Sequence, residues 1–114
     1  MKIPFIDLQA QYQLYKDEID TAIHGVLDTS QYIMGPAVAE FEENLSKYTG
    51  AKHSIGCASG TDALLIALMA IGIKPGDEII TSPFTFIASS EVISLMGAIP
   101  VFVDIEADTY NIDA

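Results

Sequence analysis

The sequence "CASGTDALLIALMAIG", residues 57–72, places three small residues and an aspartate directly before a run of nine apolar residues. This pattern predicts a helix over residues 63–71 that stops at Gly72. The predicted helix is apolar nearly all round, so we expect other elements to cover it on more than one side. Two interpretations of the small residues remain open at this point. They form a helix cap and a turn, or they present backbone N–H groups to an anion at the positive helix end.

The segments around this helix read as strands of a parallel sheet. We expect short strands in "SIGCA" (residues 54–58), in "KPGDEIITS" (74–82) after a turn, and in "IPVFVDIE" (99–106). Between the last two, "FTFIASSEVISLMG" (84–97) predicts a helix closed by its final glycine. Strands and helices that alternate at this spacing indicate βαβ units and the α/β class.

Two helices precede this part of the chain. Asp7 can cap a helix that runs to about Leu27, with apolar residues at helical spacing along one stripe. Pro36 suits the first position of a second helix, and Gly50 is a plausible stop.

The domain organisation follows from these elements. Residues 1–52 form a helical lead-in and residues 53–114 a βαβαβ segment. Three strands make an incomplete sheet, and the sequence ends shortly after the last of them. We therefore expect residues 1–114 to be the amino-terminal portion of a larger α/β domain.

Composition excludes several classes of function. The 114 residues include five Lys, no Arg and 16 acidic residues, for a net charge of −11. Nucleic-acid and anionic-membrane surfaces need clustered cations, which this chain does not offer. The N-terminus has no secretory pattern, and the longest uncharged apolar run, residues 63–73, is too short to cross a bilayer. We expect a cytoplasmic protein.

Candidate metal ligands and nucleophiles are few. His24 and His53 lack partners at metal-ligand spacing, so no metal site is predicted. Cys57, the single cysteine, has no evident base and reads as a buried strand residue. Asp104 ends a predicted strand, and a role for it in a ligand site at that edge of the sheet stays open. Asp62 would repel an anion, so we expect its side chain to point away.

Two common phosphate motifs are absent. A P-loop needs Gly-Lys-Ser/Thr at the helix start, and no Lys is present there. Gly56 and Gly60 lie four residues apart, which does not fit the G-x-G-x-x-G dinucleotide fingerprint.

A second feature, "SPFTFIASS" (residues 82–90), follows the next strand. In a parallel sheet it lies at the same carboxyl edge as Ser59–Thr61. Phe84 or Phe86 could stack on a planar ligand there, or both could fill the core. An anion cradle beside an aromatic ring suits a flat, phosphorylated cofactor, and pyridoxal phosphate has that shape.

These segments resemble a known family. "SGTDAL" (59–64), "PGDEIITSPFTFIAS" (75–89) and "VFVDIEADTYNID" (101–113) are similar to the DegT/DnrJ/EryC1/StrS family of pyridoxal-phosphate-dependent nucleotide-sugar aminotransferases. "IPFIDLQAQY", "QYIMGPAVAEFE" and "YTGAKH" match its amino-terminal segment in the same order. The resemblance covers the whole chain and implies the large, mainly parallel-sheet domain of fold type I, preceded by two helices.

The resemblance also implies roles for individual residues. Gly60 and Thr61 would bind the cofactor phosphate, Phe86 would stack on the pyridine ring, and Ser59 would shape the same turn. The lysine that forms a Schiff base with the cofactor is expected downstream, so no catalytic residue is assigned in this chain. Lys74 lies at the opposite end of its strand from the ligand edge.

The implied reaction is transamination of a nucleotide-linked keto-sugar, with glutamate as the expected donor and a UDP-3-keto-sugar uronic acid as the favoured type. Family members are homodimers, and "QYIMGP" (31–36) resembles a loop that reaches the subunit interface, or is a plain connector. Two alternatives stay open. One is a dehydratase of the same family, and the other is a cofactor-free α/β binding module.

Overall fold

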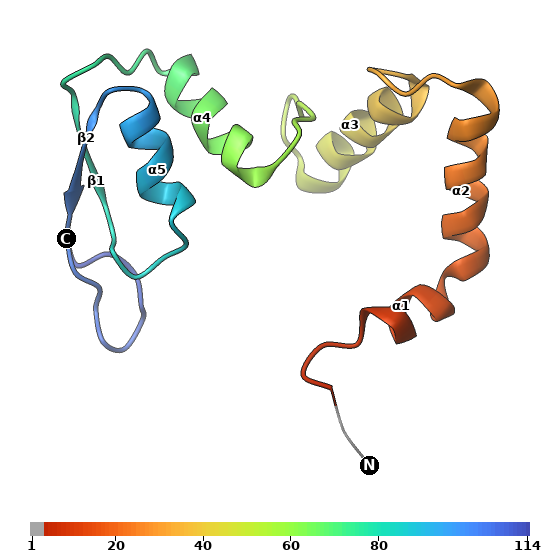
Figure 1. Ribbon diagram of the computed structural model, residues 1–114, viewed down its shortest axis with the longest axis horizontal. Coiled ribbons are helices and arrows are strands. Elements are labelled where there is room, and N and C mark those ends of the chain that lie inside the picture. The colour runs from red at the N-terminus through yellow and green to blue at the C-terminus, as the bar shows by residue number, and fades with distance from the viewer. Residues whose placement is uncertain (1–3) are drawn as a thin grey trace. The chain divides into compact units, whose positions relative to one another are not determined.

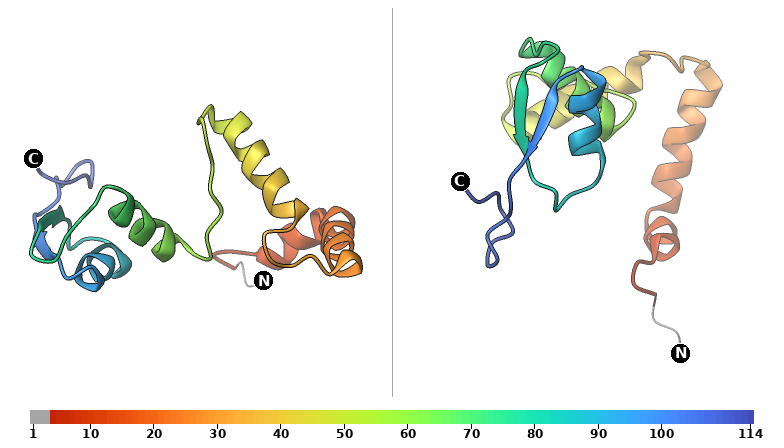
Figure 2. Two further views of the ribbon diagram at one scale, coloured as in Figure 1. Left: turned by 90° about the horizontal axis from the view of Figure 1, so that it is seen from above. Right: turned by 60° about the vertical axis from the view of Figure 1, so that its left-hand side comes forward.

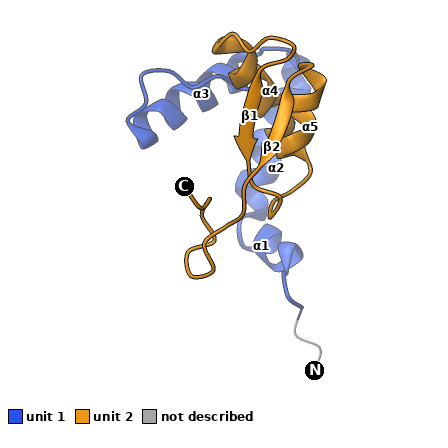
Figure 3. Cartoon of the chain, turned by 90° about the vertical axis from the view of Figure 1, so that its left-hand side faces the viewer, with its two compact units in different colours: residues 1–56 blue, residues 57–114 orange. Residues whose placement is uncertain are grey.

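The computed structural model describes residues 4–114 and divides into two compact units. Unit 1 runs to Gly56, and unit 2 comprises Cys57–Ala114 (Figure 3). Lys2 is one of the five lysines, and Ile3 is the first residue of the "IPFIDLQAQY" segment. Both lie outside the described residues. No described helix is both long enough and apolar enough to cross a membrane.

Unit 1 is helical, with α1 (Leu8–Leu14), α2 (Lys16–Thr29) and α3 (Pro36–Thr49) (Figure 1). Asp7 caps α1, because its carboxylate accepts a 2.9 Å hydrogen bond from the Ala10 N–H. Pro36 is the first residue of α3, and Gly50 ends it in the left-handed conformation (φ +73°). These predicted start and stop signals are confirmed.

The prediction of a single helix from Asp7 to about Leu27 is wrong, because the helix is interrupted at Tyr15. The backbone there leaves helical geometry (φ −114°, ψ +18°), and the Tyr15 N–H bonds the carbonyl of Tyr12, three residues back instead of four. The break interrupts the expected apolar stripe, and neither α1 nor α2 contains a buried residue.

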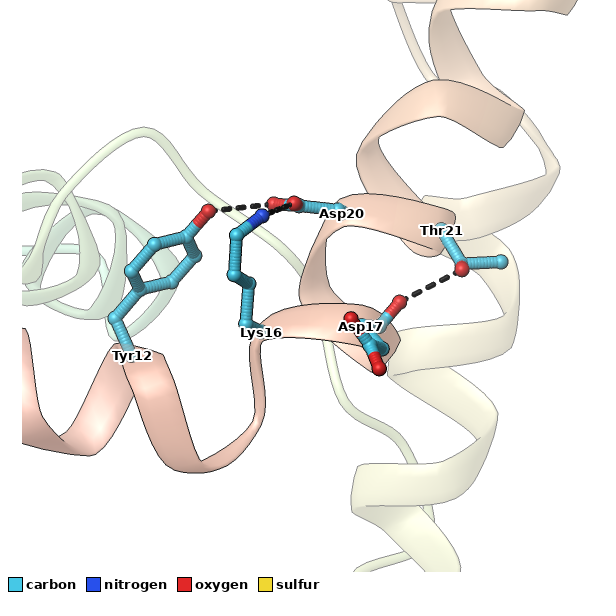
Figure 4. A network of polar contacts seen from close by, with 5 residues as sticks. All are labelled: Tyr12, Lys16, Asp17, Asp20 and Thr21. Carbon is cyan, nitrogen blue, oxygen red and sulfur yellow. Dashed lines mark hydrogen bonds and ion pairs between the residues drawn. The ribbon is translucent and has the colours of Figure 1, made fainter.

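A polar network joins the two helices across this break (Figure 4). The Tyr12 hydroxyl donates to the Asp20 carboxylate at 2.7 Å, and the Lys16 ammonium also pairs with Asp20. The Lys16 nitrogen lies 5.5 Å from the centre of the Tyr12 ring. The hydrogen bond from Lys16, and then that from Tyr12, lowers the pKa of Asp20. The bond to Asp20, and then the neighbouring Tyr12 side chain, raises the pKa of Lys16.

The strand expected in residues 54–58 is absent. The Gly56 N–H donates to the Glu42 carboxylate at 2.6 Å, and the Ser46 hydroxyl donates to that of Ser54 at 2.9 Å, so side chains of α3 hold this segment. A strand needs a neighbouring backbone to form a ladder, and no described residues pair with this segment.

Unit 2 contains α4 (Gly60–Ala70), β1 (Glu78–Thr81), α5 (Ala88–Leu95) and β2 (Ile99–Phe102). The two strands are parallel, in register from Glu78 opposite Ile99 to Thr81 opposite Phe102. Figure 2 shows them side by side with α5 next to them. The predicted parallel βαβ unit is confirmed, whereas the described residues form two named strands instead of three.

The core of unit 2 lies between α5 and its neighbours. Val92 and Ile93 on α5 are each 2% exposed, and Ala98 is 7% exposed. Five partly buried residues pack against them: Leu65, Leu68, Ile73, Ile79 and Met96. Gly97 closes α5 as predicted, with φ +73°, and an added Cβ would lie 3.2 Å from the ring of Pro75.

The prediction that α4 is covered on several sides is wrong for the described residues. α4 packs against α5, while Leu64, Ile66 and Met69 remain 44%, 47% and 59% exposed. An α-helix with one packed neighbour buries only one stripe, whatever the rest of its sequence.

Candidate functional site

The first turn of α4 begins at Gly60, three residues earlier than the sequence pattern predicts. Ser59 is the N-cap, with extended backbone (φ −157°, ψ +166°). Its hydroxyl oxygen accepts a 3.1 Å hydrogen bond from the Asp62 N–H, and its carbonyl accepts one of 3.0 Å from the Ala63 N–H. Gly60 and Thr61 therefore lie inside the helix, at the end where N–H groups point outward.

These two residues supply free hydrogen-bond donors. Within the described part of the chain, no partner is found for the N–H of Gly60, the N–H of Thr61 or the Thr61 hydroxyl. A helix N-terminus also carries partial positive charge. Ser59 thus caps the helix while the two following residues remain available to an anion, so the cap and the cradle can coexist.

Gly60 has a position that the protein alone does not explain. Its φ is not positive, and an added Cβ would meet no atom within 4 Å. A glycine inside a helix costs roughly 0.5–1 kcal/mol relative to alanine. Open space beside an unforced glycine fits the close approach of a ligand to the backbone.

Asp62 lies in the first turn of α4, beside the cap residue. Its carboxylate accepts a 3.0 Å hydrogen bond from the Ser59 hydroxyl. The carboxylate gains from the helix dipole and from the serine O–H, which explains this orientation.

The segment after β1 carries the two aromatic candidates. The Phe84 N–H donates to the Ser82 hydroxyl at 3.1 Å, and the Ser89 N–H donates to the Phe86 carbonyl at 3.2 Å. Phe84 and Phe86 are 64% and 74% exposed, so the alternative that both fill the core is wrong for the described chain. The helix that follows begins at Ala88 and not at Phe84.

The two features lie toward the same edge of unit 2. In Figure 1 both strands run downward, and the N-terminal ends of α4 and α5 are their lower ends. The carboxyl end of β1 leads into residues 82–87, which precede α5. The topology therefore directs the free donors of α4 and the exposed aromatic segment to the carboxyl edge of the sheet, where ligands bind in open α/β folds.

Comparison with known proteins shows the family to which the chain belongs. Residues 13–114 match the family described as DegT/DnrJ/EryC1/StrS aminotransferase family. The chain belongs to this family. It is 53% identical over 111 residues to the UDP-2-acetamido-2-deoxy-3-oxo-D-glucuronate aminotransferase of Pseudomonas aeruginosa, which covers 97% of this chain and 31% of the relative.

Solved structures agree with this assignment. A family aminotransferase from Brucella abortus superposes with a TM-score of 0.94 at 47% identity, over 98% of this chain and 30% of that one. NtdA from Bacillus subtilis with bound cofactor PMP gives a TM-score of 0.91 at 34% identity, over 98% of this chain and 26% of that one. The predicted α/β fold of a fold type I aminotransferase is confirmed, and the chain spans about 30% of the length of these relatives.

The structure also places the other residues considered from the sequence. The Lys74 N–H bonds the Asp77 carboxylate at 2.8 Å in the turn before β1, at the opposite end of that strand from residues 82–87. The expectation of a buried Cys57 is wrong, because the residue is exposed and its thiol donates to the Ser59 carbonyl at 3.4 Å. Among the described residues no group of three His, Cys, Asp or Glu is suited to hold a metal.

One residue near the aromatic segment was missed by sequence reasoning. Tyr110 stacks on Phe84, with ring centroids 5.7 Å apart and ring planes at 25°. It does so from a backbone with φ +59°, which tyrosine adopts rarely. No sequence pattern signals a left-handed tyrosine, so the contact is visible only in the structure.

Proposed function

We propose that this chain is the amino-terminal part of a pyridoxal-phosphate-dependent aminotransferase that acts on a nucleotide-linked keto-sugar. The family match over residues 13–114 carries the proposal. Glutamate is the proposed amino donor. A UDP-linked 3-keto-sugar uronic acid is the substrate type that we favour, because the P. aeruginosa relative carries such a substrate in its name.

The residues at the start of α4 fit the phosphate of that cofactor. Gly60 and Thr61 offer two free N–H groups and a free hydroxyl at a positive helix end, and the space beside Gly60 is open. Ser59 fixes the turn by bonding Asp62. When bound, pyridoxal phosphate supplies the electron sink that transamination requires.

Phe86 is the proposed contact to the pyridine ring. It lies on the segment after β1 and is the more exposed of the two phenylalanines, whereas Phe84 already stacks on Tyr110. An aromatic face against the cofactor orients the ring and excludes water from one side of it. Phosphate contacts and ring stacking together fix the position of a flat ligand.

The chemistry itself is proposed to need residues outside this chain. The lysine that bonds the cofactor is expected downstream, and we assign no catalytic residue among residues 1–114. The complete protein is proposed to be a cytoplasmic homodimer, with residues 31–36 near the interface. That loop has exposed Tyr32, Ile33 and Met34, at 59%, 90% and 73%.

The phosphate assignment is tested by Thr61→Ala in the complete protein. Loss of one charge-assisted hydrogen bond should weaken pyridoxal phosphate binding by about 1.5–3 kcal/mol, roughly ten- to a hundredfold in Kd. Absorbance titration of the cofactor-free protein measures this. Thr21→Ala is the matched control, since the Thr21 hydroxyl bonds the Asp17 carbonyl within α2. Equal affinities in the two variants would refute the assignment.

A further inference from the structure

The segment 104–113 is a closely bonded loop at the end of β2. Its two sides meet in an antiparallel bridge between Ile105 and Ile112. The Glu106 N–H donates to the Asn111 carbonyl at 2.9 Å, and the Asp113 N–H donates to the Asp104 carbonyl at 2.9 Å. Backbone bonds at both ends leave the residues between them little conformational freedom.

Tyr110 lies within this loop in an unusual backbone conformation. Its N–H donates to the Glu106 carbonyl at 2.9 Å while its φ is +59°. The neighbouring Thr109 hydroxyl donates to the Glu106 carboxylate at 2.7 Å and accepts from the Asn111 N–H at 3.2 Å. A bulky residue keeps a left-handed backbone only where surrounding bonds enforce it, so the loop dictates where the Tyr110 ring lies.

The Tyr110 ring meets the aromatic segment that follows β1. It stacks on Phe84 with centroids 5.7 Å apart, and among the described residues its own hydroxyl forms no hydrogen bond. The contact therefore acts through the ring alone. The backbone of Phe84 is also held, because its N–H donates to the Ser82 hydroxyl at 3.1 Å.

The same segment is also fixed at its far end. The Thr85 and Ser89 hydroxyls lie 3.2 Å apart, and the Ser89 N–H bonds the Phe86 carbonyl. Phe86 thus lies between the stacked Phe84 and the first turn of α5, with its own ring exposed. Loss of the stack on Phe84 would therefore loosen the start of this segment, while the bonds to Ser89 would still hold its end.

We propose that Tyr110 is a positioning residue that holds Phe84 by stacking and thereby fixes Phe86 where it meets the cofactor ring. Because Phe84 stacks on Tyr110, Phe86 is the phenylalanine of this segment that is available to contact a ligand. The cofactor part of this inference rests on the proposed function above, whereas the mechanical part concerns residues 82–90 of the cofactor-free protein.

Two substitutions in the complete protein separate the ring from the backbone. Tyr110→Phe keeps the ring, and Tyr110→Asn removes it while tolerating positive φ better than most residues do. Hydrogen exchange of residues 82–90 is measured without cofactor. The Kd and the circular dichroism of bound pyridoxal phosphate are measured separately.

In Tyr110→Asn we expect exchange over residues 82–90 to rise about two- to tenfold, the weight of an aromatic pair, with a similar rise in Kd and a changed dichroism signal. Tyr110→Phe should match the unmodified protein. Unchanged exchange in Tyr110→Asn, equal damage by Tyr110→Phe, or exchange raised throughout the chain would each overturn the proposal. Failure of the unmodified protein to bind pyridoxal phosphate would instead refute the proposed function, and the exchange data would still decide the role of the stack.

Discussion

Unit 1 and unit 2 are ordered by different means. In unit 1, Gly35 is the one described residue that is buried, and the helices depend on caps, turns and exposed ion pairs. Unit 2 has a small apolar core in which Val92 and Ile93 are each 2% exposed. Local bonds define single elements, whereas a shared core fixes elements against each other.

This difference bears on where a ligand site can be built. Residues that bind a ligand need to be held by packed elements, because small displacements weaken several contacts at once. The aromatic segment after β1 leads directly into α5, the helix that carries the core. α4 packs on that same helix. The proposed contacts to the cofactor therefore all lie in unit 2.

The largest expected effect that tests this difference between the two units comes from removing side-chain volume from the core of unit 2. Ile93→Ala should lower the free energy of unfolding by about 2–5 kcal/mol, through lost burial and a residual cavity. Ile23→Ala in α2, where the side chain is 53% exposed, is the matched change in unit 1 and should cost well under half as much. Urea unfolding of the cofactor-free complete protein measures both. Equal losses would show that unit 1 has a core that the described residues do not explain.

The smallest expected effect concerns the network at the α1–α2 break. Hydrogen bonds from Lys16 and Tyr12 lower the pKa of Asp20, so the stabilisation is full above the pKa of an unfolded aspartate. It is lost as the pH falls through the lowered value. Asp20→Asn should loosen residues 8–20 slightly and remove that acid dependence, as measured by hydrogen exchange against pH.

The control for this prediction is Glu43→Gln in α3. Glu43 pairs with Lys47 at 2.6 Å, and that pairing lowers its pKa, but both residues belong to one helix. The change should affect α3 alone. Added salt should weaken both exposed pairs. An Asp20→Asn variant whose exchange over residues 8–20 matches the unmodified protein at neutral pH would mean that the network does not hold α1 to α2.

The sequence predicted those parts of the structure that depend on local chemistry. Asp7, Pro36, Gly50 and Gly97 mark helix ends where the pattern places them, and the parallel βαβ unit follows from the alternation of elements. It did not predict the break at Tyr15. That break comes with side-chain bonds between two helices, which periodicity does not encode.

The site was predictable to a similar extent. Small residues before an apolar helix left a helix cap and an anion site open. In the structure Ser59 is the cap, and among the described residues no partner is found for the donors of Gly60 and Thr61. The Ser59–Asp62 bond and the Phe84–Tyr110 stack were not predictable. Both depend on where a side chain turns once the backbone is placed, and in Tyr110 that backbone is one that tyrosine seldom adopts.

Packing within the described residues demands glycine at one position and leaves it unexplained at others. An added Cβ at Gly35 would lie 2.2 Å from the Gln31 carbonyl oxygen, so packing alone demands glycine there. At Gly60 nothing lies within 4 Å. The same is true of Gly25 in α2, where no ligand is proposed.

The central claim is therefore tested most directly by Gly60→Ala in the complete protein, with Gly25→Ala as control and with pyridoxal phosphate compared with pyridoxal. We predict that Gly60→Ala leaves the melting temperature of the cofactor-free protein unchanged or slightly raised, because alanine favours helix. Its affinity for pyridoxal phosphate should fall at least about tenfold, because the added methyl group keeps the phosphate from approaching the backbone N–H groups closely enough for one charge-assisted hydrogen bond. Its affinity for pyridoxal, and both affinities of Gly25→Ala, should stay the same. An unchanged preference for the phosphorylated cofactor in Gly60→Ala would contradict the assignment of this helix end as the phosphate site.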